Sequence, residues 1–505
     1  MTKKYCTKIL YYKYNIFAIW HIVSFTYLCK NLIEQKILID QELLTKKRTK
    51  SKSKKMYIET YGCQMNFSDS EIVASILSKN NYISTKNIEE ADIILVNTCS
   101  IREKAEETVR KRLKFYNSVK KRNKNIMVGV MGCMAERLKT KLLEEEKLVD
   151  IVVGPDAYRD LPKLIKKVED GRKAINVILS KEETYGNISP VRFLSNGVTA
   201  FVSITRGCDN MCSFCVVPFT RGRERSRNPN SIIVECKELI RNNFKEVTLL
   251  GQNVDSYLWY GGGLKKDFNK ANDKEKADSI NFAKLLRIVA EECPELRIRF
   301  STSNPQDMTE EVIKTMKSHA NICNYIHLPV QSGSNKILKL MNRGYTREKY
   351  INLIDTIKKH IPDCGLSMDM ISGFCDETDS DHSMTLSLMD YVKYDYGYMF
   401  KYSDRPNTQA HRKLEDNVDD ETKAIRLSEI ISKQRQHSLE NNKRKIGSKF
   451  EVLVEGISKK SENDFFGRNM QNNVIIFPKE KSKIGDIVTV EVEKCTSATL
   501  IGKII

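Results

Sequence analysis

Three short apolar segments near the start of the chain each run into a cysteine. The segments are residues 57–61, 93–97 and 126–131, and the cysteines are Cys63, Cys99 and Cys133. The segments have the length and apolar content of buried strands, and the amphipathic segment 68–79 predicts a helix capped by Ser68 or Asp69. Because the carboxyl ends of parallel strands open onto one edge of a sheet, we expect the three cysteines to meet there.

A second series of strand and helix patterns follows a polar stretch around residues 182–195. Its apolar segments are 200–205, 247–251, 297–302, 325–330, 366–371 and 398–402, and its amphipathic segments include 231–242, 282–292 and 347–360. Six such repeats predict an open or partial barrel with its chemistry at the carboxyl ends of the strands. The segment 261–276, glycine-rich and then charged, is expected to form a solvated surface loop.

The pattern changes again from about residue 442. Short strands are predicted at 450–455, 473–477, 487–493 and 499–505, which favours a small antiparallel barrel of the oligonucleotide-binding kind, with a plain packing domain as the alternative. The prediction is therefore an α/β chain of three domains behind a leader. These are the leader at 1–55, a parallel α/β domain at 56–170, a partial (β/α)6 barrel at 194–440 and the small barrel at 442–505.

The strongest chemical signal is the loop Cys208-Asp-Asn-Met-Cys212-Ser-Phe-Cys215, which directly follows a predicted strand. Three thiolates on one tight loop can hold three irons of a 4Fe-4S cluster and leave the fourth iron open to a substrate or cofactor. A structural zinc site normally closes with four ligands, and no fourth cysteine or histidine stands near this loop.

The three cysteines of the first domain are expected to hold a second 4Fe-4S cluster, again with one open iron. Taken singly, each of Cys63, Cys99 and Cys133 has the alternative of being a small buried hydrophobe. Fourteen cysteines in 505 residues do not make a disulfide scaffold, which favours a reducing compartment, and we expect the cytoplasm.

The net charge of +19 is uneven along the chain. Residues 1–55 carry 13 basic and 3 acidic side chains, so the remaining chain is only mildly basic, which is compatible with RNA binding without establishing it. The apolar segment 16–28 is shorter than the roughly 20 residues that cross a membrane, and no small-residue cleavage site is evident. We expect a dispensable start with Met56 as the true beginning, or alternatively an organelle-targeting segment or a membrane anchor.

The loop at 208–215, with Phe214 before its last cysteine, resembles the radical S-adenosylmethionine superfamily. From about residue 56 to its end, the chain resembles the methylthiotransferase family. The matching segments are Tyr61-Gly-Cys-Gln-Met-Asn66, Asn97-Thr-Cys-Ser-Ile-Arg102, Gly129-Val-Met-Gly-Cys133, Arg206-Gly-Cys208, Cys215-Val-Val-Pro-Phe-Thr-Arg-Gly222, and 452–456 with Cys495-Thr-Ser-Ala-Thr-Leu500 in an RNA-binding barrel called the TRAM domain. Gln64-Met65-Asn66 and the segment 216–222 are similar to the subfamily that acts on N6-dimethylallyladenosine in tRNA.

The resemblance implies two 4Fe-4S clusters and S-adenosylmethionine as cofactors. One S-adenosylmethionine would methylate a sulfur carried at the Cys63, Cys99 and Cys133 cluster. A second would bind the open iron at Cys208, Cys212 and Cys215 and be cleaved to a 5′-deoxyadenosyl radical, so that the methylthio group is transferred to C2 of adenosine 37 beside the anticodon. The implied partners are tRNA, an electron donor such as flavodoxin or ferredoxin, and a sulfur donor, and we expect a monomer with no stable membrane partner.

Two weaker groups of candidates surround this site, and no catalytic residue is predicted beyond the cluster cysteines. Residues at predicted strand ends are expected to face S-adenosylmethionine, with helix capping as the alternative. They are Gln252, Asn253, Gln331 and Asp369. Four arginines after the cysteine loop are expected to meet RNA phosphate or the cofactor carboxylate, or else to form a solvated basic turn. They are Arg221, Arg223, Arg225 and Arg227.

Some positions depart from the family pattern. Cys375-Asp376 stands where the family commonly has Pro-Gly, and Asn304 stands where a histidine is frequent. These departures put loop geometry in question rather than the chemistry, because none of them is a predicted cluster ligand. The competing functions are a methylthiotransferase that acts on a ribosomal-protein side chain or on threonylcarbamoyl-adenosine in tRNA, and a non-catalytic RNA-binding protein that uses metal as a staple.

Overall fold

The computed structural model describes residues 53–99 and 103–505. The expectations for residues 1–52 lie outside this part of the chain. Among the described residues, no helix has both the length and the apolar character needed to cross a membrane.

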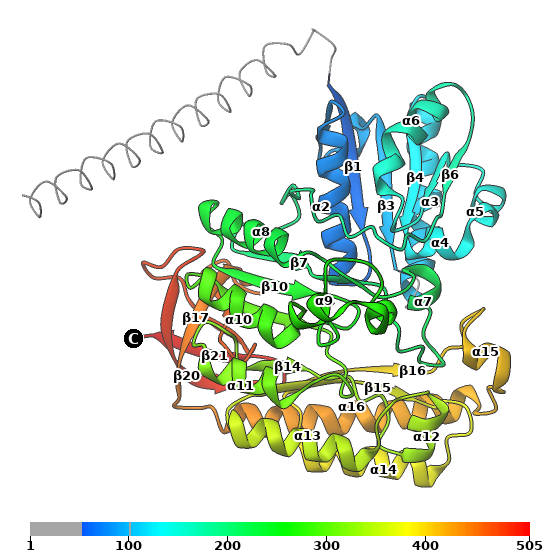
Figure 1. The fold of residues 1–505 in the computed structure, drawn as a ribbon. Helices are drawn as coiled ribbons and strands as arrows, with labels where there is room; N and C mark the ends of the chain where they lie inside the picture. The colour runs from blue at the N-terminus through cyan, green and yellow to red at the C-terminus, as the bar shows by residue number, and fades with distance from the viewer. Residues whose placement is uncertain (1–52, 100–102) are drawn as a thin grey trace, which may run out of the picture. The chain divides into compact units, whose positions relative to one another are not determined.

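A six-stranded sheet in the order β2-β1-β3-β4-β5-β6 organises the N-terminal domain (Figure 1). Its strands are β1 Lys54–Thr60, β2 Tyr82–Ser84, β3 Ile93–Thr98, β4 Met127–Gly132, β5 Ile151–Val153 and β6 Ala174–Asn176. Its helices are α2 Gln64–Ser78, α3 Glu103–Arg122, α4 Cys133–Leu138, α5 Thr140–Glu145, α6 Leu161–Glu169 and the short 3-10 helices η1 Ile88–Glu90 and η2 Tyr158–Asp160. All pairs from β1 through β6 are parallel, which confirms the predicted α/β architecture.

The central strand β3 is buried on both faces, as expected for a parallel sheet with helices on each side. Ile93 and Leu95 belong to the core shared with α2 and α6, whereas Ile94 and Val96 belong to the core shared with α3 and α4. Successive residues of a strand point to opposite faces, so one apolar run serves both cores.

The first helix begins earlier than predicted. Cys63, and neither Ser68 nor Asp69, is the N-cap of α2, and Gly62 turns the chain with a φ of +111°. Ser68 and Asp69 lie inside the helix and are buried. The N-cap prediction was wrong because the helix begins before both residues, and the Asp69 carboxylate pairs with Arg206 and Arg221 instead of the helix end.

Six parallel strands form the central partial barrel, which confirms the predicted (β/α)6 core. β7 Thr199–Ser203, β10 Glu246–Leu250 and β13 Arg297–Ser301 form one ladder, and β14 Tyr325–His327, β15 Gly365–Ser372 and β16 Tyr396–Lys401 form another. A parallel bridge between Ile298 and Ile322 joins the two. The helices are α7 Val217–Thr220, α8 Pro229–Arg241, α9 Asp273–Ala277, α10 Phe282–Glu292, α11 Glu310–Ser318, α12 Asn335–Leu340, α13 Arg347–His360, α14 Asp379–Val392, α15 Gln409–Lys413 and α16 Asp420–Lys443. Two short antiparallel pairs, each joined by a long connection, add β8 Thr205–Arg206 with β9 Arg225–Ser226, and β11 Leu258–Trp259 with β12 Ile280–Asn281.

The segment 261–276 is more ordered than the predicted loop. It contains the 3-10 helix η3 Lys265–Lys270 and the start of α9. Asn272 and Glu275 form a reciprocal capping box at α9, and such a cap allows a short charged segment to become helical.

Five strands close the C-terminal barrel in the order β17-β18-β19-β21-β20. They are β17 Lys449–Ile457, β18 Asp464–Arg468, β19 Val474–Pro478, β20 Ile487–Cys495 and β21 Leu500–Ile504. The barrel is confirmed, although the sequence did not indicate β18 and the pair β19–β21 is parallel. Two arginines of β13 hold it to the core: Arg297 Nη1 donates to the carbonyl of Arg468 (3.3 Å), and Arg299 Nη2 donates to that of Asn469 (2.6 Å).

Candidate active site

The cysteine loop at 208–215 lies between β8 and α7. Gly207 begins it with a φ of +77° and donates its N–H to Gln252 Oε1 (2.7 Å). A Cβ on Gly207 would collide with the carbonyl of Arg223, so only glycine fits there. The Cys208 N–H donates to the Gly222 carbonyl (3.2 Å), and Cys208, Cys212 and Cys215 are all free thiols.

The residues on either side of Cys212 are held by the segment that ends α12. Asn342 Nδ2 donates to the Met211 carbonyl (2.9 Å), and Ser213 Oγ donates to the Leu340 carbonyl (2.8 Å). Arg343 Nη1 donates to Cys212 Sγ (3.2 Å). A guanidinium at this distance stabilises a thiolate, which is the form that binds iron.

The other three predicted ligands meet at the carboxyl edge of the N-terminal sheet. Cys63 begins α2, Cys99 follows β3 and Cys133 begins α4. A Cβ on Gly62 would collide with the Cys99 side chain, so the first two cysteines approach across this glycine. A hydrogen bond from Cys99, reinforced by Arg221, lowers the pKa of the Cys63 thiol, whereas burial raises the pKa of Cys133.

The role of the six cysteines as cluster ligands stays a prediction. Among the described residues, no three His, Cys, Asp or Glu side chains converge on a single metal ion. The lack of a site for a single ion is compatible with an iron-sulfur cluster, because each thiolate of a cluster site binds a different iron.

Arg221 connects the two sets of cysteines. It lies six positions after Cys215, yet its Nε donates to Cys133 Sγ (3.2 Å) and its Nη2 donates to Asp69 Oδ2 and Asn66 Oδ1 (both 2.8 Å). Burial, with the Cys212 and Cys133 thiols also contributing, raises the pKa of Cys215. The two cysteine sets are therefore near neighbours.

A buried ion-pair network surrounds this contact. Asp69 Oδ1 accepts from Arg206 Nη1 (2.8 Å), and Asp156 Oδ1 lies 2.5 Å from Arg225 Nη2. Burial opposes the ionisation of Asp69, but Arg206 and Arg221 outweigh it and hold its pKa below the usual value. The network joins acids of the N-terminal domain to arginines of the barrel.

The four arginines after the loop do not share one environment, although the prediction treated them alike. Arg221, Arg225 and Arg227 are buried, so a solvated basic turn describes only Arg223. Sequence reasoning did not identify Asn66, Asp69, Arg206 or Arg343 as site residues. Asn66, Asp69 and Arg206 lie close in sequence to predicted cluster cysteines, which was the only signal for them, and Arg343 lies far from all six and carried none.

Three of the predicted S-adenosylmethionine residues, Gln252, Asn253 and Gln331, follow the carboxyl ends of barrel strands, Asp369 lies within β15, and none of the four caps a described helix. Gln252 holds the cysteine loop, and Asn253 Nδ2 donates to Asp307 Oδ2 (2.6 Å). The Gln331 N–H donates to the Asp369 carbonyl (2.9 Å), and Gln331 has a φ of +75°. A left-handed backbone at a residue that is not glycine is typical of functional sites.

Buried oxygens without a protein partner lie beside these residues. Within the described chain they include Asn253 Oδ1, Asp209 Oδ2 and Glu224 Oε2. Burial raises the pKa of Glu224 to about 7. Buried acceptors normally have a donor, so a ligand with amino or hydroxyl groups fits this edge of the barrel.

The departures at 375 and 376 are accommodated locally. Asp376 has a φ of +60°, a conformation that glycine adopts easily, and Asn417 Nδ2 donates to its Oδ1 (2.6 Å). Cys375 is buried against an apolar cluster. Glu377 turns inward, where Gly373 N donates to its Oε2 (2.7 Å) and Arg426 pairs with it.

Three segments of the chain match known families. Residues 55–154 match the uncharacterized protein family UPF0004, residues 202–389 match the radical SAM superfamily, and residues 443–505 match the TRAM domain. The predicted domain limits differ slightly and stay predictions.

The chain is also similar to curated proteins over most of its length. It is 66% identical over 451 residues to a tRNA-2-methylthio-N(6)-dimethylallyladenosine synthase of Christiangramia forsetii, covering 89% of this chain and 94% of that relative. It is 50% identical over 458 residues to the protein of the same name from Bacteroides fragilis, covering 91% and 97%.

Among solved structures, it resembles the radical S-adenosylmethionine methyltransferase TsrM of Kitasatospora setae, solved with cobalamin and a 4Fe-4S cluster. The TM-score is 0.52 at 13% identity, covering 71% of this chain and 77% of that one. At this identity the likeness shows the fold alone.

Proposed function

The chain belongs to the tRNA-2-methylthio-N(6)-dimethylallyladenosine synthase family, and from this premise we propose that it converts N6-dimethylallyladenosine at position 37 of tRNA to the 2-methylthio derivative. It is a radical S-adenosylmethionine enzyme. The reaction would use two S-adenosylmethionine molecules and a sulfur held at the site of Cys63, Cys99 and Cys133.

The contact between Arg221 and Cys133 is the observation that carries this proposal. A plain radical generator has no need of a second cysteine set beside its cofactor loop. Sulfur insertion needs both, because the sulfur and the activated carbon must come together in one place.

The donor sets fit two 4Fe-4S clusters, because each consists of three free thiols and a 4Fe-4S cluster can leave its fourth iron to a ligand from outside the protein. Cys208, Cys212 and Cys215 would hold the cluster that binds S-adenosylmethionine. Cys63, Cys99 and Cys133 would hold the auxiliary cluster. When bound, the first cluster and S-adenosylmethionine supply radical chemistry for the adenine C2–H bond, which is neither acidic nor electrophilic.

The protein's own side chains position these groups. Gln252 fixes the start of the cysteine loop, and Arg343 balances negative charge at Cys212. Asn253, Gln331 and Asp369 would contact S-adenosylmethionine, with the unpaired Asn253 Oδ1 as an acceptor for its amino or ribose groups. The ion pairs of Asp69 hold the N-terminal domain against the barrel and thereby set the separation of the two sites.

The partners follow from the same premise. The TRAM domain would bind the tRNA, and the target base would leave its stack to reach the space between the two sites. We propose a monomer in the cytoplasm, reduced by flavodoxin or ferredoxin and resupplied by a sulfur donor.

Iron and sulfide counting after anaerobic reconstitution tests the cluster assignment. We expect roughly eight irons per chain in the wild type and roughly four in the Cys208→Ala/Cys212→Ala/Cys215→Ala variant. One cluster in the wild type would refute the sulfur-insertion proposal.

Mass spectrometry of nucleosides tests the substrate. A deletion strain should lose the 2-methylthio mark from tRNA and regain it with the wild-type gene. Loss of a mark from a ribosomal protein or from threonylcarbamoyl-adenosine instead would favour the other specificities.

A further inference from the structure

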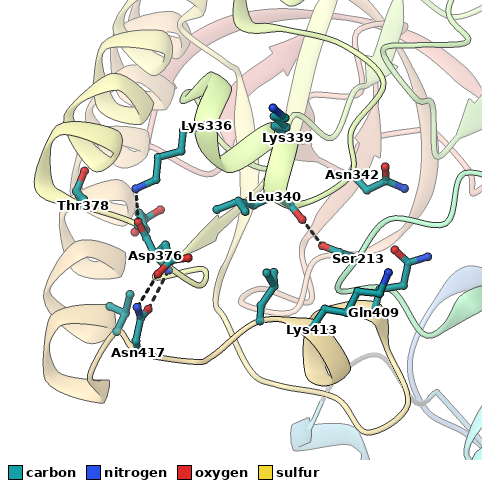
Figure 2. A pocket seen from close by; sticks show the side chains of 13 residues that line it. Ser213, Lys336, Lys339, Leu340, Asn342, Asp376, Thr378, Gln409, Lys413 and Asn417 are labelled. Atoms are coloured by element: carbon teal, nitrogen blue, oxygen red, sulfur yellow. Dashed lines mark hydrogen bonds between the residues drawn. The ribbon is translucent and has the colours of Figure 1, made fainter.

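A pocket of about 1000 Å³ lies against the cysteine loop at Ser213 (Figure 2). Its walls come from α12, from α15 and from the loop after β15. The lining residues include Lys336, Lys339, Asn342, Asp376, Lys413 and Asn417. Neither the ion-pair network of Asp69 nor the predicted S-adenosylmethionine residues take part in it.

The pocket wall forms hydrogen bonds with both sequence neighbours of Cys212. Asn342 holds the Met211 carbonyl (2.9 Å), and Ser213 Oγ donates to the Leu340 carbonyl (2.8 Å). Ser213, which directly follows Cys212, is therefore part of the pocket wall, and Met211, which directly precedes it, is held by a residue of that wall.

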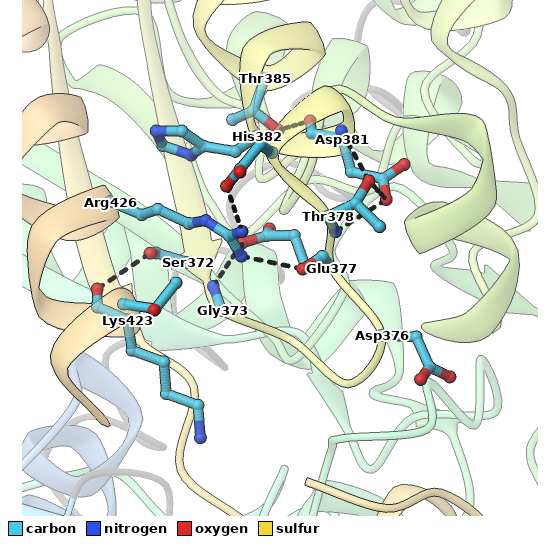
Figure 3. Close-up of polar contacts among 12 residues, drawn as sticks. Ser372, Gly373, Asp376, Glu377, Thr378, Asp381, His382, Thr385, Lys423 and Arg426 are labelled. Atoms are coloured by element: carbon cyan, nitrogen blue, oxygen red, sulfur yellow. Dashed lines mark hydrogen bonds and ion pairs between the residues drawn. The ribbon is translucent and has the colours of Figure 1, made fainter. Parts of the chain in front are cut away.

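The pocket has more lysine ammonium groups than carboxylates that are free to pair with them. Lys339 and Lys413 are exposed and form no ion pair with the described residues. Lys336 contacts the Asp376 carbonyl (2.6 Å) and pairs with Asp381 (3.2 Å). Glu377 lines the pocket but is buried and paired with Arg426, as Figure 3 shows.

We propose that this lysine-rimmed pocket is the docking surface for an acidic one-electron donor protein. The proposal rests on the proposed function, which requires reduction of a cluster at Cys208, Cys212 and Cys215. In the docked complex the donor loses one electron and the cluster gains it, with no bond made or broken. Opposite charges steer such encounters, and redox complexes bury little surface, so two or three lysines around a small pocket suffice.

RNA is the competing polyanion for the same lysines, because the target base must reach the carboxyl ends of the barrel strands, but the domain that binds RNA contacts the other ends. The TRAM barrel contacts Arg297 and Tyr396, which are the first residues of β13 and β16. The pocket, by contrast, is lined by residues that follow the carboxyl ends of β14 and β15. The RNA-binding domain and the pocket therefore belong to opposite ends of the barrel strands.

The test uses a Lys339→Glu/Lys413→Glu double variant of the full-length reconstituted enzyme and reduced flavodoxin as the probe. We expect the Kd of labelled flavodoxin, measured by fluorescence anisotropy at low salt, to rise roughly tenfold or more. The KM for flavodoxin in 5′-deoxyadenosine formation should rise in parallel. The rate with dithionite, a small reductant that needs no docking surface, should stay within about twofold of wild type.

The matched control is Lys274→Glu/Lys276→Glu, which reverses two exposed lysines on α9. It should leave both flavodoxin constants unchanged. An unchanged Kd in the pocket variant, or weaker tRNA binding in place of weaker flavodoxin binding, would overturn the docking proposal. A wild-type enzyme that forms no 5′-deoxyadenosine with dithionite would instead contradict the proposed function, whatever the flavodoxin affinity.

Discussion

Replacing Asp69 by asparagine tests whether buried ion pairs hold the N-terminal domain against the barrel. The Asp69 carboxylate is completely buried and accepts from Arg206 and Arg221 at 2.8 Å each. Asp69→Asn keeps the size of the side chain but leaves two buried guanidinium groups with less opposing charge. Breaking a buried pair from one side costs about 3–5 kcal/mol, because the remaining charge is desolvated and uncompensated.

At a few degrees per kcal/mol for a large domain, this loss corresponds to a thermal midpoint lower by roughly 6–20 °C. The assay is circular dichroism of the metal-free protein at pH 7.5. Asp170→Asn is the matched control, because Asp170 is half exposed and pairs with the exposed Arg172 at the surface, where ion pairs add little. A midpoint for Asp69→Asn that lies within 2 °C of the control would refute the claim that these pairs hold the domains together.

Three further predictions concern other parts of the molecule. Burial raises the pKa of Glu224 to about 7, so the Glu224 carboxylate lowers the stability of the fold as pH rises from about 4.5 through 7. Glu224→Gln should therefore raise the thermal midpoint at pH 8, by the equivalent of about 3 kcal/mol, and by much less at pH 5. Equal effects at both pH values would contradict this prediction. Asp376→Val should lower the free energy of unfolding in urea by about 1–3 kcal/mol, because a β-branched residue resists the left-handed backbone at this position. Asp376→Gly should stay close to wild type, and equal losses of stability in the two variants would argue against backbone strain as the cause. Arg299→Met should loosen the TRAM barrel and weaken tRNA binding in filter assays while 5′-deoxyadenosine formation without tRNA is unchanged, and unaltered tRNA affinity would disprove this role.

The parts of the fold that the sequence predicted are those governed by local pattern. The strands β1, β3 and β4 appear as apolar runs, and chain topology alone brings the cysteines after them to one sheet edge. β18 escaped prediction because its five residues include Gly467, whose Cβ would collide with the backbone of Leu453, so a residue typical of turns here marks close packing between strands.

The same distinction holds for the candidate site, where contacts between residues close in sequence could be predicted and contacts between distant residues could not. The cysteines of the loop are close in sequence, so their meeting needs no knowledge of the rest of the fold. Arg221 is different, because its hydrogen bond to Asp69 joins residues 152 positions apart. A run of alternating arginines has the same pattern whether it is solvated or buried, and what decides the outcome is whether another part of the chain supplies acids and excludes water.

The arginines therefore show where function and stability meet in this protein. Guanidinium groups as deeply buried as Arg206 and Arg225 are tolerated only with paired acids, and those acids, Asp69 and Asp156, belong to the other domain. The same pairs that satisfy the desolvated charges bring Cys133 within hydrogen-bond distance of Arg221. Weakening them should alter the separation of the two cysteine sets as well as stability, so Asp69→Asn should uncouple 5′-deoxyadenosine formation from methylthio transfer even at temperatures where the variant is folded.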